Sequence, residues 1–185
     1  MEPPVLVGAR VRLRGVLPSD VRPRQRLGWH REIERGYGSE RGTGPMTDAE
    51  AAKWFELMAT QDRFLQWVVE VEGEPAGMAS LRLLNPVDRK ALFAVGMHAP
   101  RFIGRGLGAE STRLVLGHAF DDLGLHRVGL RVLAFNAPAI ACYRRCGFVE
   151  EGREREDCWL EGRWHDDVMM SLLDHEYRRQ ATPSG

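Results

Sequence analysis

The residues best placed to do chemistry follow an apolar run in the middle of the chain. Residues 91–98 are almost continuously apolar, and Gly104, Gly106 and Gly108 follow within ten residues. Glycines let a backbone approach a ligand closely and present its N–H groups. A helix that starts there adds unpaired donors and partial positive charge. A buried strand, a glycine-rich turn and a helix in this order predict an anion site suited to a pyrophosphate.

The glycine pattern alone does not identify a nucleotide site. It lacks the Lys-Ser/Thr pair of a P-loop, and its spacing is G-x-G-x-G instead of the dinucleotide fingerprint G-x-G-x-x-G. Taken alone, the segment fits a tight strand-to-helix turn without a ligand equally well. Arg101 and Arg105 add positive charge on either interpretation.

The cysteine spacing and the net charge argue against a metal site and against nucleic-acid or membrane partners. Cys142 and Cys146 lie four residues apart on an expected helix, and Cys158 follows. Without a second pair at ligand spacing, we interpret them as packing residues, predict no metal site, and expect a reducing, cytoplasmic setting. Lys+Arg and Asp+Glu both number 26. We therefore expect neither nucleic acid nor a membrane as a partner, and the start Met-Glu-Pro-Pro has no signal-peptide pattern.

Alternating strands and capped helices surround the glycine turn. The patterns predict a strand near residues 11–17, a helical segment to about 35, a glycine-rich loop over 36–46 and a helix opened by a Thr47–Glu50 capping box. A hairpin over 65–84, the helix to about 123, a strand near 127–133, a helix from Asn136 to Gly147 and a last hairpin around 161–162 follow. This order predicts one mixed α/β domain over 1–185, with flexible ends at about 1–9 and 179–185.

The ordered motifs of residues 91–175 resemble the GNAT acetyltransferase superfamily. Besides the apolar strand, they include Arg101-x-x-Gly104-x-Gly106, the segment 143–148 (YRRCGF) and the segment 162–166 (GRWHD). The N-terminal part fits more loosely. Within the superfamily the pattern is most similar to the Rim-type branch, which contains ribosomal-protein N-terminal acetyltransferases and small-molecule relatives. The resemblance implies a central mixed, mostly antiparallel sheet flanked by helices, with splayed central strands.

The resemblance also implies where acetyl-CoA binds. The cofactor is expected between the splayed strands 91–98 and 127–134, where backbone groups near Met97 and His98 would pair with its pantetheine arm. Backbone amides would hold the pyrophosphate, and the residues that carry them are Ile103, Gly104, Arg105, Gly106, Leu107 and Gly108. The family pattern fits in two registers, beginning at Arg101 or at Ile103, and we prefer the second. Asn136 would hydrogen-bond the cofactor arm, and it also suits a helix N-cap.

Tyr143 is the candidate that protonates the leaving thiolate, since many relatives have a Tyr near the sulfur and a phenol can donate at neutral pH. The alternative is a core Tyr that packs with Ile140. The general base stays open, because residues 91–98 contain no carboxylate. The candidates are His30, Glu32, Glu34, His98 and Asp166.

The loop region 28–46, with Trp29 and Tyr37, is expected to form the acceptor site. Together these features predict an N-acetyltransferase that moves an acetyl group from acetyl-CoA to a primary amine, either a protein N-terminus or a small molecule. The alternative is a non-catalytic module that binds acyl-CoA. A homodimer is expected by analogy with related folds.

Overall fold

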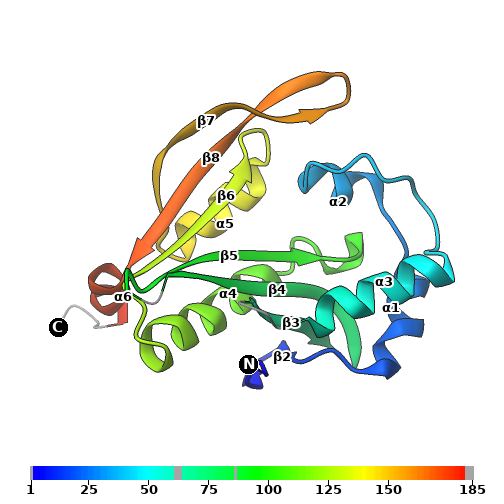
Figure 1. Cartoon of the computed structure of the whole chain (residues 1–185), viewed down its shortest axis with the longest axis horizontal. Coiled ribbons are helices and arrows are strands. Elements are labelled where there is room, and N and C mark those ends of the chain that lie inside the picture. Colours follow the sequence, from blue (N-terminus) through cyan, green and yellow to red (C-terminus); the bar gives the residue numbers. More distant parts are fainter. Residues whose placement is uncertain (1, 61–63, 86, 182–185) are drawn as a thin grey trace.

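The computed structural model describes residues 2–60, 64–85 and 87–181. Within these residues, one eight-stranded sheet has the order β1-β2-β3-β4-β5-β6-β8-β7 (Figure 1). All neighbouring strands are antiparallel except β5 and β6, which are parallel. The strands are β1 Leu6–Val7, β2 Arg12–Arg14, β3 Phe64–Val71, β4 Glu74–Asn85, β5 Lys90–Met97, β6 Arg127–Leu133, β7 Val149–Leu160 and β8 Arg163–Leu173.

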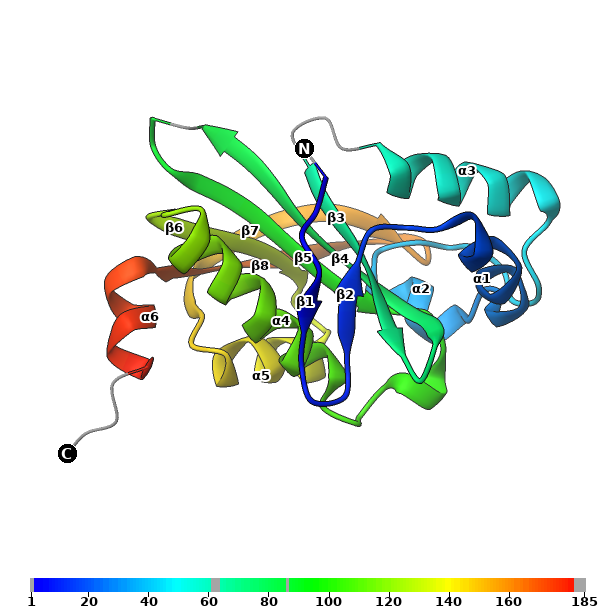
Figure 2. The same ribbon diagram turned by 90° about the horizontal axis from the view of Figure 1, so that it is seen from below.

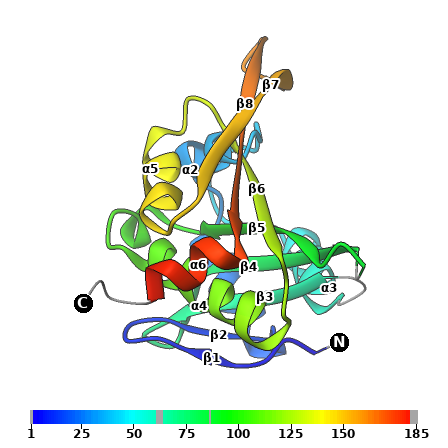
Figure 3. The same cartoon turned by 90° about the vertical axis from the view of Figure 1, so that its left-hand side faces the viewer.

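Helices cover both faces of this sheet. They are α1 Val21–Leu27, α2 Arg31–Gly36, α3 Asp48–Ala59, α4 Leu107–Gly117, α5 Ala137–Arg145 and α6 Asp174–Ala181. Helices α1 and α3 pack together on one face, and α4 and α5 lie on the other (Figures 2 and 3). The mixed, mostly antiparallel sheet flanked by helices confirms the predicted fold class.

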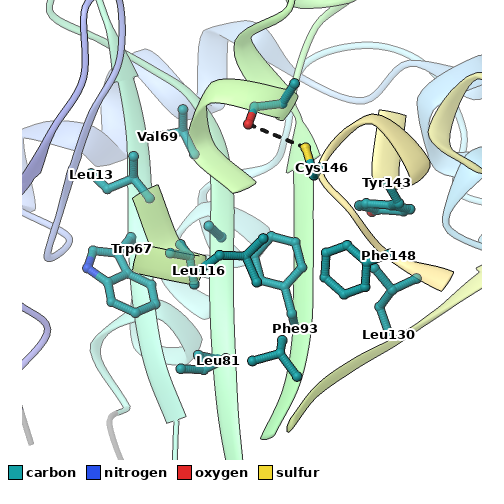
Figure 4. Close-up of a cluster of buried hydrophobic side chains, with 14 of the residues drawn as sticks. Leu13, Trp67, Val69, Leu81, Phe93, Leu116, Leu130, Tyr143, Cys146 and Phe148 are labelled. Atoms are coloured by element: carbon teal, nitrogen blue, oxygen red, sulfur yellow. Dashed lines mark hydrogen bonds between the residues drawn. The ribbon is translucent and has the colours of Figure 1, made fainter. Parts of the chain in front are cut away.

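The two faces have separate cores because strand residues alternate between them. On the α4–α5 face, the fully buried Trp67 joins a large cluster with Phe93, Leu116 and Phe148 (Figure 4). On the α3 face, Val68 packs with Met46, Trp54 and Met58. Since β3 is buried on both faces, it forms a rigid centre on which the neighbouring strands are built.

Local signals set several helix ends as predicted. The Thr47 side chain accepts the Glu50 N–H at 3.2 Å, and the Glu50 carboxylate accepts the Thr47 N–H at 2.7 Å. This reciprocal pair is the predicted capping box, which satisfies two amides at the start of α3. Asn136 likewise caps α5 by accepting the Ala139 N–H at 3.3 Å.

Two segments differ from the sequence prediction. The helical segment expected to reach residue 35 is broken at Gly28, which has a φ of 68°. There Trp29 and Gly44 exchange backbone hydrogen bonds of 2.7 and 3.1 Å, which tie the two ends of a long loop together. In addition, Leu6 and Val7 of the expected flexible start pair with β2. Residues 1 and 182–185 lie outside the described residues.

Strands β5 and β6 diverge soon after they meet. Among the described residues, they pair only where Lys90, Ala91 and Leu92 face Arg127, Val128 and Gly129. Beyond this point β6, α5 and the β7–β8 hairpin turn away from β3–β5, and α2 lies across the opening (Figure 1). The divergence leaves one edge of β5 without a partner strand and positions the site.

Candidate active site

The open edge of β5 offers backbone groups to a ligand. The His98 N–H donates to the Ala76 carbonyl at 2.8 Å, so the amide of His98 is used on the β4 side. Because alternate residues of a strand bond to opposite neighbours, Val95 and Met97 direct their N–H groups to the edge that β6 has left. Of the two expected backbone contacts, the structure therefore leaves the amide of Met97 free and engages that of His98.

The glycine turn after β5 forms a cradle of unpaired amides. Gly104 and Gly106 have φ values of 74° and 78°, in the left-handed region, and Gly106 caps α4. Glu110 makes the first hydrogen bond of the helix, to the Gly106 carbonyl at 3.1 Å. In the described part of the chain, no acceptor bonds the amides of residues 104–109. A Cβ on Gly104 or Gly108 would meet only open space, so the turn leaves room for a phosphate group.

Other residues fix this turn from outside. The Arg10 guanidinium donates to the Arg105 carbonyl at 2.7 Å and pairs with the Glu110 carboxylate at 3.0 Å. Ile103 is 54% exposed, and its N–H already donates to the Pro100 carbonyl. Leu107 is fully buried in the core. The amide of Ile103 is therefore engaged within the protein. The other residues expected to hold the pyrophosphate lie together in the turn and at the start of α4, and their amides have no acceptor among the described residues.

Asn136 connects this region to the acceptor side. Besides capping α5, its side-chain amide donates to the Gly36 carbonyl at 3.3 Å, at the end of α2. The N-cap interpretation is therefore confirmed. A contact from Asn136 to the cofactor stays a prediction.

Tyr143 lies on α5 against the back of β5. Its ring makes edge contacts with Phe93 at 6.4 Å and Phe148 at 5.9 Å between centroids. Burial, followed by the nearby Tyr37 phenol, raises the pKa of Tyr143. Within the described residues, its hydroxyl makes no hydrogen bond. The packing role expected as the alternative is present, and the phenol also keeps a proton that it can donate.

The two acceptor candidates reach different elements. The Tyr37 hydroxyl donates to the Met97 carbonyl at 3.4 Å. It lies over Gly96, where an added Cβ would be only 1.4 Å from the phenol oxygen. Trp29 instead stacks between Arg24 and Arg41, 4.8 and 4.5 Å from its ring, and donates to Glu50. Tyr37 thus touches the end of β5, whereas Trp29 supports the base of the loop.

The structure separates the candidate bases. His98 packs edge-on against Trp54 at 6.2 Å, and burial holds its pKa well below the usual value. His30 bonds the Leu27 carbonyl, and Asp166 accepts the Glu156 N–H. Glu32 is exposed. Glu34 is the buried carboxylate of the group, 7% exposed.

Sequence reasoning missed Arg24, which is 2% exposed and bonds the Gly28 carbonyl at 2.9 Å. Burial, together with the positive charge of Arg41, lowers the pKa of Arg24 to about 10 against the effect of Glu34. Five arginines lie between residues 22 and 35. Nothing in their spacing marks Arg24 as the buried member.

A cavity of about 500 Å³ opens between α2, the following loop and the turn of the β7–β8 hairpin. Arg31 and Arg35 pair there with Glu161 at 3.4 and 2.9 Å. The cavity is lined by Arg31, Arg35, Ser39, Glu40, Arg41, Gly42, Thr43, Leu160, Glu161 and Gly162. Its charged lining is three arginines and two glutamates, so the wall is not acidic.

Comparison with known proteins points to a single family. A family model described as an acetyltransferase (GNAT) domain matches residues 10–149. The spermidine N(1)-acetyltransferase of Escherichia coli is 32% identical over 112 residues, and the match spans 60% of each chain. The ribosomal protein bS18 alanine N-acetyltransferase of Salmonella typhimurium is 30% identical over 115 residues, which are 60% of this chain and 72% of that enzyme.

A solved structure extends the likeness over nearly the whole chain. The spermidine N-acetyltransferase of Vibrio cholerae, in complex with CoA and spermine, superposes with a TM-score of 0.77. It is 27% identical, and the match covers 92% of this chain and 99% of that one. No helix in the described residues is both long and apolar enough to cross a membrane. Nor do these residues contain a cluster of side chains suited to a metal ion.

Proposed function

Because the chain belongs to the GNAT acetyltransferase family, we propose that it transfers the acetyl group of acetyl-CoA to a primary amine. The observation that carries this proposal is the open edge of β5, which leads into the cradle of unpaired amides at residues 104–109. The open strand edge suits an extended pantetheine arm, and the cradle of amides suits a pyrophosphate. The cofactor supplies the activated thioester, so the protein has only to bind, orient and exchange protons.

Three parts of the site support the reaction. An amide on the open edge of β5, at Val95 or Met97, can stabilise the negative charge that develops during acyl transfer. The Tyr143 hydroxyl carries a proton for the departing sulfur. Tyr37 marks the opposite side of the strand, from which the amine would approach.

The acceptor is an amine on either a small molecule or a protein, and both kinds occur among the relatives. The arginine-rich cavity between α2 and the turn of the β7–β8 hairpin does not resemble the acidic wall that a polyamine needs. We therefore propose an acceptor without a chain of positive charges. A polyamine is the second candidate acceptor, because the relatives from Escherichia coli and Vibrio cholerae are spermidine N-acetyltransferases.

Location and assembly are secondary parts of the proposal. The three cysteines are free thiols, which supports a reducing cytoplasmic setting. The outer strand β7 has an exposed edge, which supports pairing with a second copy. Sedimentation of the purified protein would test the homodimer.

Titration calorimetry with acetyl-CoA and CoA, followed by thiol release with a panel of amines, tests the function. We expect binding in the micromolar range and thiol release with at least one amine. Binding without release for any amine would favour the non-catalytic acyl-CoA-binding module. Absence of binding would overturn the cofactor assignment.

A further inference from the structure

A buried carboxylate on the acceptor side is left without a partner. Glu34 is 7% exposed, yet its carboxylate makes no hydrogen bond or ion pair within the described residues. Its oxygens are not among the fully enclosed side-chain atoms that lack a partner. An unpaired carboxylate in such a place lowers stability, which makes it a candidate for a functional group.

Glu34 lies near Tyr37, the residue of the acceptor region that reaches β5. It lies three residues before Tyr37, hence on the same side of the α2 turn. Its negative charge acts on the Tyr37 phenol, whose hydroxyl reaches the Met97 carbonyl over Gly96. The Asn136 amide bonds the Gly36 carbonyl and holds this end of α2 against the start of α5. Glu34 therefore lies near the Tyr37 phenol, which contacts the end of β5 on the face opposite Tyr143.

Charged and titratable groups from other elements lie near Glu34 or near its neighbour Arg24. Arg24 of α1 lies outside ion-pair distance of Glu34, but the Glu34 charge still affects the pKa of Arg24. Arg41, in the loop after α2, also affects the pKa of Arg24. His98, at the end of β5, is held neutral by burial and by Arg24. A cation at this distance from the carboxylate disfavours a second cation nearby, so it lowers the pKa of an ammonium group bound there.

We propose that Glu34 binds the ammonium group of the acceptor and accepts its proton before attack. This inference rests on the proposed function. The ammonium proton moves to the Glu34 carboxylate, which leaves a neutral amine and a neutral carboxylic acid. The amine nitrogen then forms the bond to the acetyl carbon, the carbon–sulfur bond breaks, and the thiolate takes a proton from Tyr143. The new amide nitrogen gives up its second proton, which restores the Tyr143 hydroxyl, and Glu34 releases its proton to solvent. Both side chains are thereby regenerated, and one proton is released per turnover.

The variant Glu34→Gln tests the assignment, with Glu32→Gln as the matched control on the exposed side of α2. We expect Glu34→Gln to bind CoA as the wild type does and to lose about 100-fold in kcat/KM for an alkyl amine at pH 7. The loss should shrink as the pH rises, because the free amine then deprotonates in solution. An amine with a pKa below 6, already neutral at pH 7, should lose less than fivefold. Glu32→Gln should behave as the wild type.

Several results would overturn the proposal while leaving the enzyme assignment intact. One is a Glu34→Gln profile that parallels the wild type at every pH, whether the activity is retained or uniformly reduced. Another is an equal loss for the low-pKa and alkyl amines. If Glu34→Gln does not fold, Glu34→Asp replaces it. We expect this variant to keep partial activity with the pH profile of the wild type, because it keeps a carboxylate, and complete loss of activity in a folded Glu34→Asp protein would contradict the role. Failure of the wild type itself to release thiol with any amine would instead contradict the proposed function.

Discussion

Tyr37 and Tyr143 contact β5 from its opposite faces. Tyr37 lies over Gly96 and donates to the Met97 carbonyl, whereas Tyr143 packs edge-on against Phe93. The two phenols are close enough for the charge of Tyr37 to raise the pKa of Tyr143. The open edge of β5 thus has one hydroxyl on the acceptor side and one on the side of α5.

Replacing Tyr143 with Phe should separate chemistry from binding. The ring packing remains, but the proton donor is lost, so we expect kcat to fall about 10- to 100-fold. Affinity for CoA should stay within about twofold, as measured by calorimetry. Tyr177→Phe is a suitable control, because the Tyr177 hydroxyl on α6 donates to Asp121 and has no role in the proposed site. Unchanged kcat in Tyr143→Phe would leave the residue a purely structural role.

Gly104→Ala should weaken CoA binding beyond its effect on stability. Gly104 and Gly73 share a left-handed backbone with open space around the missing Cβ, at φ values of 74° and 81°. Each alanine should therefore cost about 1–2 kcal/mol of unfolding free energy. Gly73 lies in the β3–β4 turn, so only Gly104→Ala should also lower CoA affinity, by about tenfold or about 1.4 kcal/mol. Equal CoA affinity in the two variants would contradict the phosphate cradle.

Stability should fall as the solution becomes mildly acidic, through His98. Burial lowers the pKa of His98 well below 6.5 in the folded state. The unfolded chain therefore binds the proton more readily, and stability present above pH 6.5 is lost as the pH decreases below it. The slope contributed by one such group is at most about 1.4 kcal/mol per pH unit.

Denaturant unfolding of the wild type, His98→Gln and His175→Gln between pH 7.5 and 5 measures this contribution. We expect His98→Gln to flatten the pH dependence, whereas His175, which is exposed on α6, serves as the control. A slope that His98→Gln leaves unchanged would mean that other groups govern the acid loss.

Polyamines should be poor acceptors compared with amines that carry no further positive charge. Arg31 and Arg35 already share Glu161, and Arg41 stacks on Trp29 in the same region without an ion pair to any described residue. Coulomb repulsion from this wall should lower kcat/KM for spermidine several-fold, and added salt should reduce the difference. Arg41→Gln should improve spermidine relative to a neutral-tailed amine. Arg179→Gln, on α6, should leave the ratio unchanged. A preference for spermidine in the wild type would favour the polyamine acceptor.

Sequence patterns predicted those features that depend on neighbours in the chain. The Thr47–Glu50 capping box, the alternation of Trp67 and Val69, and the glycine turn after β5 all appear as expected. The break at Gly28 was missed because it depends on hydrogen bonds between Trp29 and Gly44, fifteen residues apart. Local periodicity carries no information about such a pairing.

The same limit applies to the site. Glycines and the position of Asn136 are visible as motifs, but the burial of Arg24 and Glu34 arises only when α1 and α2 take their places in the folded protein. Helices of seven and six residues are too short for a hydrophobic periodicity to show which charged side chain is buried. The acceptor side was for this reason less predictable than the cofactor side.

The hydrogen bond from Asn136 to Gly36 has a kinetic consequence. It joins the first turn of α5, beside the expected pantetheine arm, to the last residue of the helix that carries Glu34. A ligand that fixes Asn136 also fixes α2, and linkage requires that the two substrates strengthen each other's binding. Acetyl-CoA should therefore lower the dissociation constant of the amine, and the amine should lower that of acetyl-CoA by the same factor. In product inhibition, CoA should compete with acetyl-CoA while acting as a mixed inhibitor against the amine.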